Sequence, residues 1–157
     1  MTIDSIKEKL QETSIYHSEE SILGQQCVIG YEKRFRWRWL ATQLNTFIVA
    51  ADFGDEAITK EVIEGFLSES FKFSKQNYTG WPRGLQSGVG VIGVLISSNV
   101  TTEAKEYCEK LKSGDKWAAF TIPIVHDSSE NKTYQFLKRP YWGMICLLYT
   151  SPSPRDA

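Results

Sequence analysis

Residues 89–97 read VGVIGVLIS, and this run decides the fold. Its side chains are apolar at both alternating sets of positions, which is typical of a strand that is covered on both faces. Such strands lie at the centre of sheets that carry packed helices. The run therefore predicts the central strand of a layered α/β domain.

Helical patterns flank this strand. Residues 102–113 have apolar side chains at helical spacing and charged side chains elsewhere, and so does the segment from Ile58 to Lys75. Residues 3–12 predict a short surface helix, because Ile3, Ile6 and Leu10 recur among Lys, Glu and Gln. The residues expected to cap the two longer helices are Asp55 or Thr59, and Thr101 or Thr102.

Aromatic and β-branched residues predict four further strands. Two of them cover about 27–39 and 45–53, joined near Thr42–Asn45. The other two cover 117–125 and 133–137, on either side of a turn. The polar segment Ser14–Ser21 is predicted to be a loop.

The predicted element order is therefore α-β-β-α-β-α-β-β. Strand–helix–strand units in the middle favour parallel pairing through right-handed crossovers, and a hairpin at each end adds antiparallel pairing. We predict a single α/β domain with a mixed sheet over residues 1–145.

The overall composition excludes several classes of protein. The chain has 157 residues, of which 18 are basic and 19 acidic, so its net charge is −1. This balance does not favour nucleic acid or a membrane surface as a partner. The hydrophobic fraction of 41 % is that of an ordinary globular domain. No apolar run is long enough to span a bilayer, and the charged N-terminal segment is unlike a signal peptide.

The segment YEKRFRWRW at residues 31–39 alternates cationic and aromatic side chains. On a strand, one face would carry Arg34, Arg36 and Arg38, and the other would carry Phe35, Trp37 and Trp39. We expect the aromatic face to be buried and the arginine face to be exposed, because burying an unpaired guanidinium is costly. The stripe either is simply solvated or binds phosphate or carboxylate groups.

A glycine-punctuated loop, PRGLQSG, precedes the central strand at residues 82–88. Glycines let a backbone approach a ligand closely, and successive amides can surround an anion. The loop leads into a strand and lacks the Walker lysine, so it is not a nucleotide-binding fingerprint. The favoured explanation is a connection that needs positive φ angles. The candidate ligand residues in this loop are Arg83, Gly84 and Gly88.

The remaining candidates for chemistry have simpler explanations. The carboxylates of Asp52–Glu56 could hold Mg²⁺, but a helix N-terminus also favours them. His17 and His126 do not stand at ligand spacing from Cys27 or Cys108. We therefore predict no catalytic residues, no metal and no cofactor.

The cysteines are predicted to be free thiols. The chain has three, without CxxC spacing, as in proteins of a reducing compartment. Cys108 lies on the apolar face of its predicted helix and should be buried and unreactive.

Residues 146–156 read CLLYTSPSPRD, which resembles the translation of a transposase adapter used to build sequencing libraries. We therefore predict that residues 146–157 are an adapter-derived tail that adds nothing to the core. Residues 1–145 would then be a truncated native fragment from a metagenomic assembly, and fold reasoning should exclude the tail.

The segment from Phe35 to Gly143 resembles small uncharacterised prokaryotic proteins. The shared features are an Arg/Trp-rich strand, the PRGLQSG loop, the VGVIGVLIS strand and a closing PYWG. The resemblance implies a prokaryotic source and carries no activity.

Together these features favour a non-catalytic cytoplasmic domain that binds a protein partner or a small anionic ligand. One alternative is a nucleic-acid-contacting domain that uses Arg34, Arg36 and Arg38. A weaker alternative is an enzyme with an incomplete site, for which a cleft lined by Asp52, Asp55 and His126 would be the sign.

Overall fold

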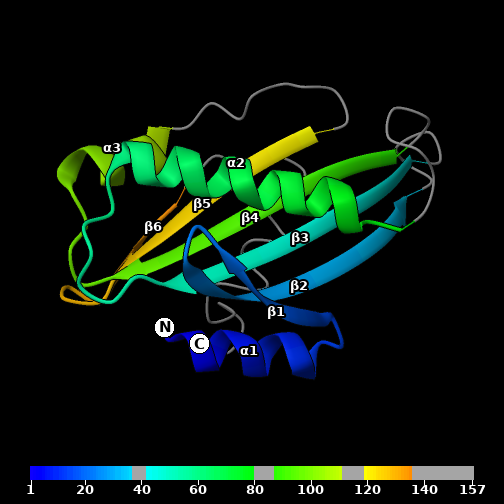
Figure 1. The fold of residues 1–157 in the computed structure, drawn as a ribbon, viewed down its shortest axis with the longest axis horizontal. Coiled ribbons are helices and arrows are strands. Elements are labelled where there is room, and N and C mark those ends of the chain that lie inside the picture. The colour runs from blue at the N-terminus through cyan, green and yellow to red at the C-terminus, as the bar shows by residue number, and fades with distance from the viewer. Residues whose placement is uncertain (37–41, 80–86, 111–118, 136–157) are drawn as a thin grey trace.

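The computed structural model describes residues 1–36, 42–79, 87–110 and 119–135, with the backbone alone at residues 34–36, 42–44, 87, 119 and 120. In these residues three helices pack on one six-stranded sheet (Figure 1). The elements are α1 (Ile3–Glu12), β1 (Tyr16–Ile22), β2 (Gln25–Arg36), β3 (Thr42–Asp52), α2 (Lys60–Asn77), β4 (Ser87–Ser97), α3 (Thr102–Lys110), β5 (Ala119–Asp127) and β6 (Lys132–Tyr134). The predicted α/β domain with a mixed sheet is confirmed.

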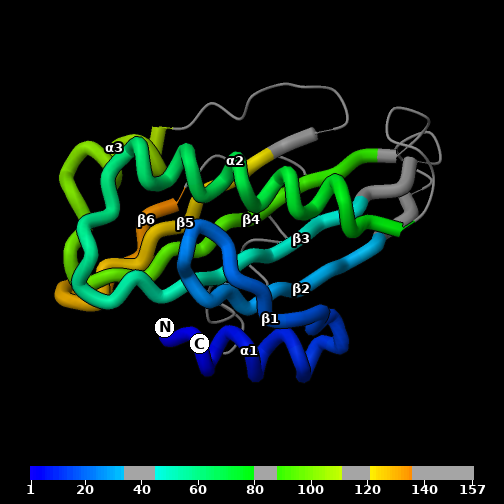
Figure 2. The backbone as a smooth tube through the Cα atoms, viewed as in Figure 1, coloured from blue at the N-terminus to red at the C-terminus, as the bar shows by residue number. Residues whose placement is uncertain are grey.

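The middle of the sheet is parallel and both ends are antiparallel. β3 pairs with β4, and β4 with β5, in parallel, whereas the pairs β1–β2, β2–β3 and β5–β6 are antiparallel. The chain passes from β3 through α2 to β4, and from β4 through α3 to β5 (Figure 2). The two predicted crossovers are therefore confirmed, and the strands lie in chain order across the sheet.

The larger core lies between the sheet and the helices α2 and α3. Phe47 and Phe66 are fully buried in it. β4 comes close to α2 at Gly93, where a Cβ atom would stand 2.7 Å from Leu67 Cδ2. The apolar run 89–97 is buried throughout, as expected for a central strand.

The smaller core lies on the opposite face of the sheet, where α1 packs (Figure 1). Ile6 and Leu10 are the buried side chains of this helix. Leu10 fills the space above Gly30 of β2, where an added Cβ would come within 2.7 Å of its Cδ2 atom. The helix predicted over residues 3–12 is confirmed.

Threonine hydroxyls cap both crossover helices. Thr59 is the N-cap of α2 and accepts a hydrogen bond from the Val62 amide. Thr101 accepts one from the Ala104 amide at 3.2 Å, at the start of α3. Of the two candidate caps predicted for each helix, the threonine Thr59 or Thr101 is therefore the one that binds a free amide of the first turn.

The structure corrects the predicted loop at Ser14–Ser21, because Tyr16–Ile22 form the edge strand β1. The element order gains one strand, α-β-β-β-α-β-α-β-β. One side chain of β1, Ile22, is buried, and the strand takes its backbone hydrogen bonds from β2. A polar composition suits an edge strand, since it discourages pairing with other chains.

Two further details of the β1–β2–β3 region differ from expectation. Leu23 and Gly24 form the β1–β2 turn with φ angles of 51° and 75°, as a two-residue hairpin turn requires. The predicted join at Thr42–Asn45 is wrong, since these residues belong to β3 and pair with Lys33–Arg36. No described helix is long and apolar enough to cross a membrane.

Candidate functional site

Polar side chains gather at both ends of the parallel strands. Open α/β sheets bind ligands at the carboxyl ends of their strands where the strand order reverses. Here the strand order follows the chain without reversal. The polar groups at the carboxyl end therefore have to be judged by their own contacts.

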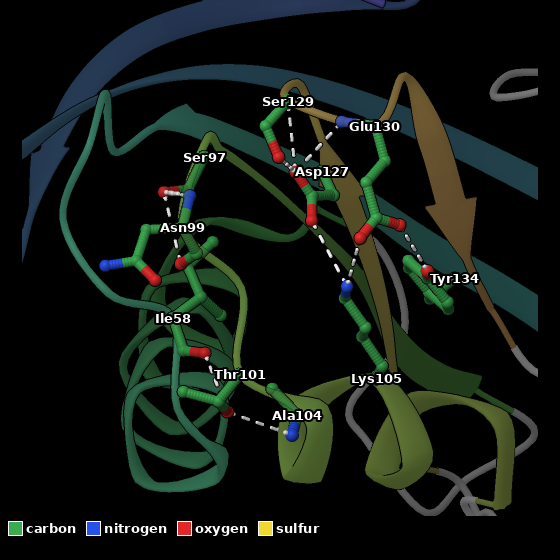
Figure 3. Close-up of polar contacts among 10 residues, drawn as sticks. All are labelled: Ile58, Ser97, Asn99, Thr101, Ala104, Lys105, Asp127, Ser129, Glu130 and Tyr134. Atoms are coloured by element: carbon green, nitrogen blue, oxygen red, sulfur yellow. Dashed lines mark hydrogen bonds and ion pairs between the residues drawn. The ribbon is translucent and has the colours of Figure 1, made fainter.

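The first group at the carboxyl end joins α3 to the β5–β6 turn (Figure 3). Asp127 is 3 % exposed, and its Oδ1 accepts hydrogen bonds from the Ser129 amide at 3.0 Å and the Ser129 hydroxyl at 2.6 Å. Lys105 Nζ lies 3.3 Å from Asp127 Oδ2 and 3.0 Å from Glu130 Oε1. The Tyr134 hydroxyl donates to the other Glu130 oxygen at 3.0 Å.

These contacts also determine the protonation states of Asp127 and Lys105. Burial would raise the pKa of Asp127, but the hydrogen bonds from Ser129 and Lys105 hold it below its ordinary value. The hydrogen bond to Glu130 raises the pKa of Lys105. Both groups remain ionised near neutral pH and bind each other. The group is a clamp between elements and not a poised acid or base.

A second group at the carboxyl end ties β4 to the loop after β3 (Figure 3). Ser97 is fully buried; its hydroxyl donates to the Glu56 carbonyl at 2.6 Å and accepts from the Asn99 amide at 3.0 Å. The Thr101 hydroxyl donates to the Ile58 carbonyl at 3.2 Å. These hydroxyls are used by the backbone, so they brace loops and do not act as nucleophiles.

The structure does not bring His126 to the acidic residues as the enzyme alternative requires. Asp52 and His126 lie in one row of the sheet with Ile96 between them, about 10 Å apart at the usual strand spacing. His126 is buried, and its Nδ1 lies 2.9 Å from the Thr133 hydroxyl. Burial and the nearby N-terminal ammonium group lower the pKa of His126. Asp55 lies exposed in the loop that follows β3.

Cys27 and Cys108 are fully buried. Burial raises the pKa of the Cys27 thiol to about 11 and that of Cys108 to about 12. A thiol with such a pKa is protonated at neutral pH and is a poor nucleophile. The predicted burial of Cys108 is confirmed.

We expect Cys108 to resist a thiol reagent in native buffer and to react once the chain is unfolded, because the reagent needs an accessible thiolate. Mass spectrometry of the labelled peptides would separate Cys108 from the other cysteines. Modification of Cys108 in the folded protein as fast as in denaturant would contradict this expectation.

The other end of the sheet carries the predicted ligand residues. Arg34 pairs with Leu44 of β3, and Leu44 pairs with Gly88 of β4. Arg36 is the last residue of β2. The structure therefore places Arg34 and Gly88 in one row of the sheet, two strands apart. The candidates Arg38, Arg83 and Gly84 lie outside the described residues, as do Trp37, Trp39 and residues 146–157.

A hydrogen-bonded pair, half-buried Tyr31 and buried Asn45, lies beside this row. The Tyr31 hydroxyl donates to Asn45 Oδ1 at 2.6 Å, and the Thr79 amide donates to the Tyr31 oxygen at 3.0 Å. Asn45 is fully buried, and its Nδ2 donates to the Gly88 carbonyl at 3.2 Å. The pair thus connects β2 and β3 to Thr79, which follows the C-cap of α2, and to the start of β4.

Aromatic rings support the pair on the α2 side of the sheet. Tyr31 stacks on Phe47, with ring centroids 4.4 Å apart and planes 9° apart. Phe73 of α2 meets Phe47 edge-on at 6.3 Å. His17, where the β1–β2 register shifts, lies 6.1 Å from the Tyr31 ring. Such packing orients the Tyr31 hydroxyl.

Sequence reasoning missed Tyr31, Asn45 and Thr79. The available signal was Asn45, a lone amide at the start of an apolar strand, where a buried amide needs hydrogen-bond partners. It was assigned to a strand connection instead. Asn45 bonds to Tyr31, 14 residues away, and to Gly88, 43 residues away, and Tyr31 bonds to Thr79, 48 residues away. No local pattern reveals contacts at these separations.

The described residues contain no group of three or more His, Cys, Asp or Glu side chains that could hold a metal ion. The candidate site considered below is the arginine end of the sheet, defined by Arg34, Arg36 and Gly88. Comparison with known proteins found no matching family model, curated protein or solved structure.

Proposed function

We propose that this domain binds a small anionic ligand at the arginine end of the sheet. The observation that carries the proposal is the strand register, which aligns Arg34 with Gly88 across β3. Two candidates that stand 54 positions apart in the chain thereby come to one edge of the molecule.

The residue types at this edge suit an anion. Guanidinium groups bind phosphate and carboxylate groups through paired hydrogen bonds. An acidic protein surface or a nucleic acid would present the same chemistry, so the experiment has to separate these sources from a small ligand.

The test compares two double variants with the same change in charge. Arg34→Gln/Arg36→Gln alters the candidate site, and Lys110→Gln/Lys132→Gln alters exposed lysines on α3 and β6. Calorimetry would measure binding of inorganic phosphate, a nucleoside triphosphate, heparin and single-stranded DNA. We expect the arginine variant to bind the small anions at least about tenfold more weakly, since a hydrogen bond to a charged group contributes about 1.5–3 kcal/mol.

The control variant should retain its affinity for the small anions to within about threefold, because dissolved salt screens the charges of surface residues that lie far from the site. Equal losses in both variants would show a general charge effect and contradict the proposal. Binding to DNA or heparin alone, with a steep salt dependence, would favour the nucleic-acid alternative. No binding of any probe to the unmodified protein would also contradict the proposal.

A further inference from the structure

We propose that the β5–β6 hairpin is an acid-sensitive latch at one edge of the sheet. In its closed form the hairpin holds His126 of β5 uncharged and buried beside Thr133 of β6. Acidification favours an open form, in which β6 leaves β5 and His126 reaches water. The latch lies at the end of the sheet opposite the proposed anion site and does not depend on anion binding.

His126 is a titratable side chain among apolar neighbours. It is 4 % exposed and lies on the face of the sheet where α1 packs, since Ile124 of the smaller core precedes it by two positions. Ile96, its neighbour on β4, belongs to the same core. Its polar contact from β6 is the Thr133 hydroxyl, 2.9 Å from Nδ1. A protonated ring would be a buried charge beside a neutral hydroxyl, which is costly.

The charged groups around His126 have opposing effects. Burial is the main cause that lowers the pKa of His126, and the N-terminal ammonium group, which precedes α1, lowers it further. Asp127 favours the charged ring, but its carboxylate lies on the opposite face, bound to Lys105 of α3 (Figure 3). Asp52 stands in the same row as His126, beyond Ile96 and about 10 Å away. The imidazole is therefore neutral near pH 7.

β6 is the part of the sheet that can separate at the lowest cost. It has three residues, Lys132–Tyr134, the fewest of the described strands. On the opposite face, the ion pairs of Lys105 with Asp127 and Glu130 hold the turn that precedes it. Separation of β6 from β5 would bring His126 to water and leave the longer strand pairings intact.

The direction of the pH dependence follows from these protonation states. The closed form lowers the pKa of His126 below its ordinary value of 6.5, and the open form restores that value, so the open form binds more protons. The latch is therefore fully stable above about pH 6.5 and weakens as the pH falls below it. The pKa values of Asp127 and Glu130 lie below 3.8 and 4.5, so both remain ionised at about pH 5.

Amide hydrogen exchange at about pH 7.5 and about pH 5 tests the latch in three proteins. These are the unmodified protein, His126→Gln and His17→Gln. Dividing each rate by that of an unstructured chain at the same pH gives a protection factor, which removes the intrinsic effect of pH. Glutamine keeps hydrogen-bonding groups and has no charge at either pH. His17→Gln is the matched control, because it removes the other histidine of the chain, exposed on β1.

We expect the paired amides of β5 and β6 to lose at least about threefold of their protection on acidification in the unmodified protein and in His17→Gln. His126→Gln should show no such loss, because it has no proton to gain at this position. A loss of the same size in His126→Gln, or no loss in the unmodified protein, would overturn the latch.

Two measurements on the unmodified protein keep the test decisive even if His126→Gln fails to fold. The β5–β6 amides should be protected at least about tenfold less than those of β4, because β6 opens without the rest of the sheet. Equal protection of the two sets would show that β6 opens only when the whole domain unfolds, and would overturn the latch. Titration of the His126 ring followed by NMR should give a pKa below 6.5, and a value at or above 6.5 would also overturn it.

Discussion

Phe47→Ala is expected to lower the free energy of unfolding by about 3–5 kcal/mol, the usual cost of removing a large core aromatic. Phe47 is 0 % exposed and is stacked on Tyr31 in the larger core. Its loss leaves a cavity at the centre of a rigid sheet, where neighbours can relax only in part. Urea unfolding, with the midpoint and slope compared between variants, measures the change.

Leu23→Ala is the control for Phe47→Ala. Leu23 lies at the β1–β2 turn and is 59 % exposed, so its truncation should change stability by about 0.5 kcal/mol or less. Similar losses in the two variants would contradict the position of Phe47 in the core. A loss confined to Phe47→Ala would also confirm that the aromatic support beneath Tyr31 bears on the stability of the whole domain.

Gly93→Val is expected to destabilise the protein by about 1–3 kcal/mol, or more if α2 cannot shift. Strand propensity alone predicts the opposite, because valine is favoured in strands and glycine is not. The structure favours destabilisation over the gain expected from strand propensity. A Cβ at this position would lie 2.7 Å from Leu67 Cδ2 and 3.4 Å from Phe66 Cε1, so the valine would clash with α2. Thermal and urea unfolding would measure the change.

Gly65→Ala provides a control of opposite sign. Gly65 lies inside α2, and a Cβ there would meet only Leu23 Cδ1, at 3.8 Å. Alanine should therefore stabilise the helix by about 0.5–1 kcal/mol. A stabilising Gly93→Val would show that α2 does not lie against β4 as described.

The structure assigns the polar residues of the carboxyl end to stability. Asp127, Lys105 and Glu130 satisfy one another, and Ser97 serves the backbone of neighbouring loops. The opposite end differs, since there the Tyr31–Asn45 pair links β2 and β3 to Thr79 and to Gly88. The proposed anion site lies at this opposite end, where the strand register aligns Arg34 with Gly88.

Local patterns predicted the elements that bury a continuous apolar face. The helices over residues 3–12 and 102–113 were predicted because their apolar side chains recur at helical spacing. The strand 89–97 was predicted because both of its faces are apolar. Each of these elements contains its own signal, and packing alters their boundaries by only a few residues.

Only the tertiary structure revealed β1, the place of Thr42–Asn45 in β3, and the Tyr31–Asn45 pair. β1 is polar, and it is a strand because β2 supplies its hydrogen-bond partners. Asn45 is a strand residue because Lys33 and Val89 pair with it on either side. Thr79 meets Tyr31 because α2 returns the chain to the start of the sheet, 48 residues later. The sequence by itself determined the α/β architecture through apolar periodicity, whereas the candidate site depends on contacts between distant residues, which periodicity does not encode.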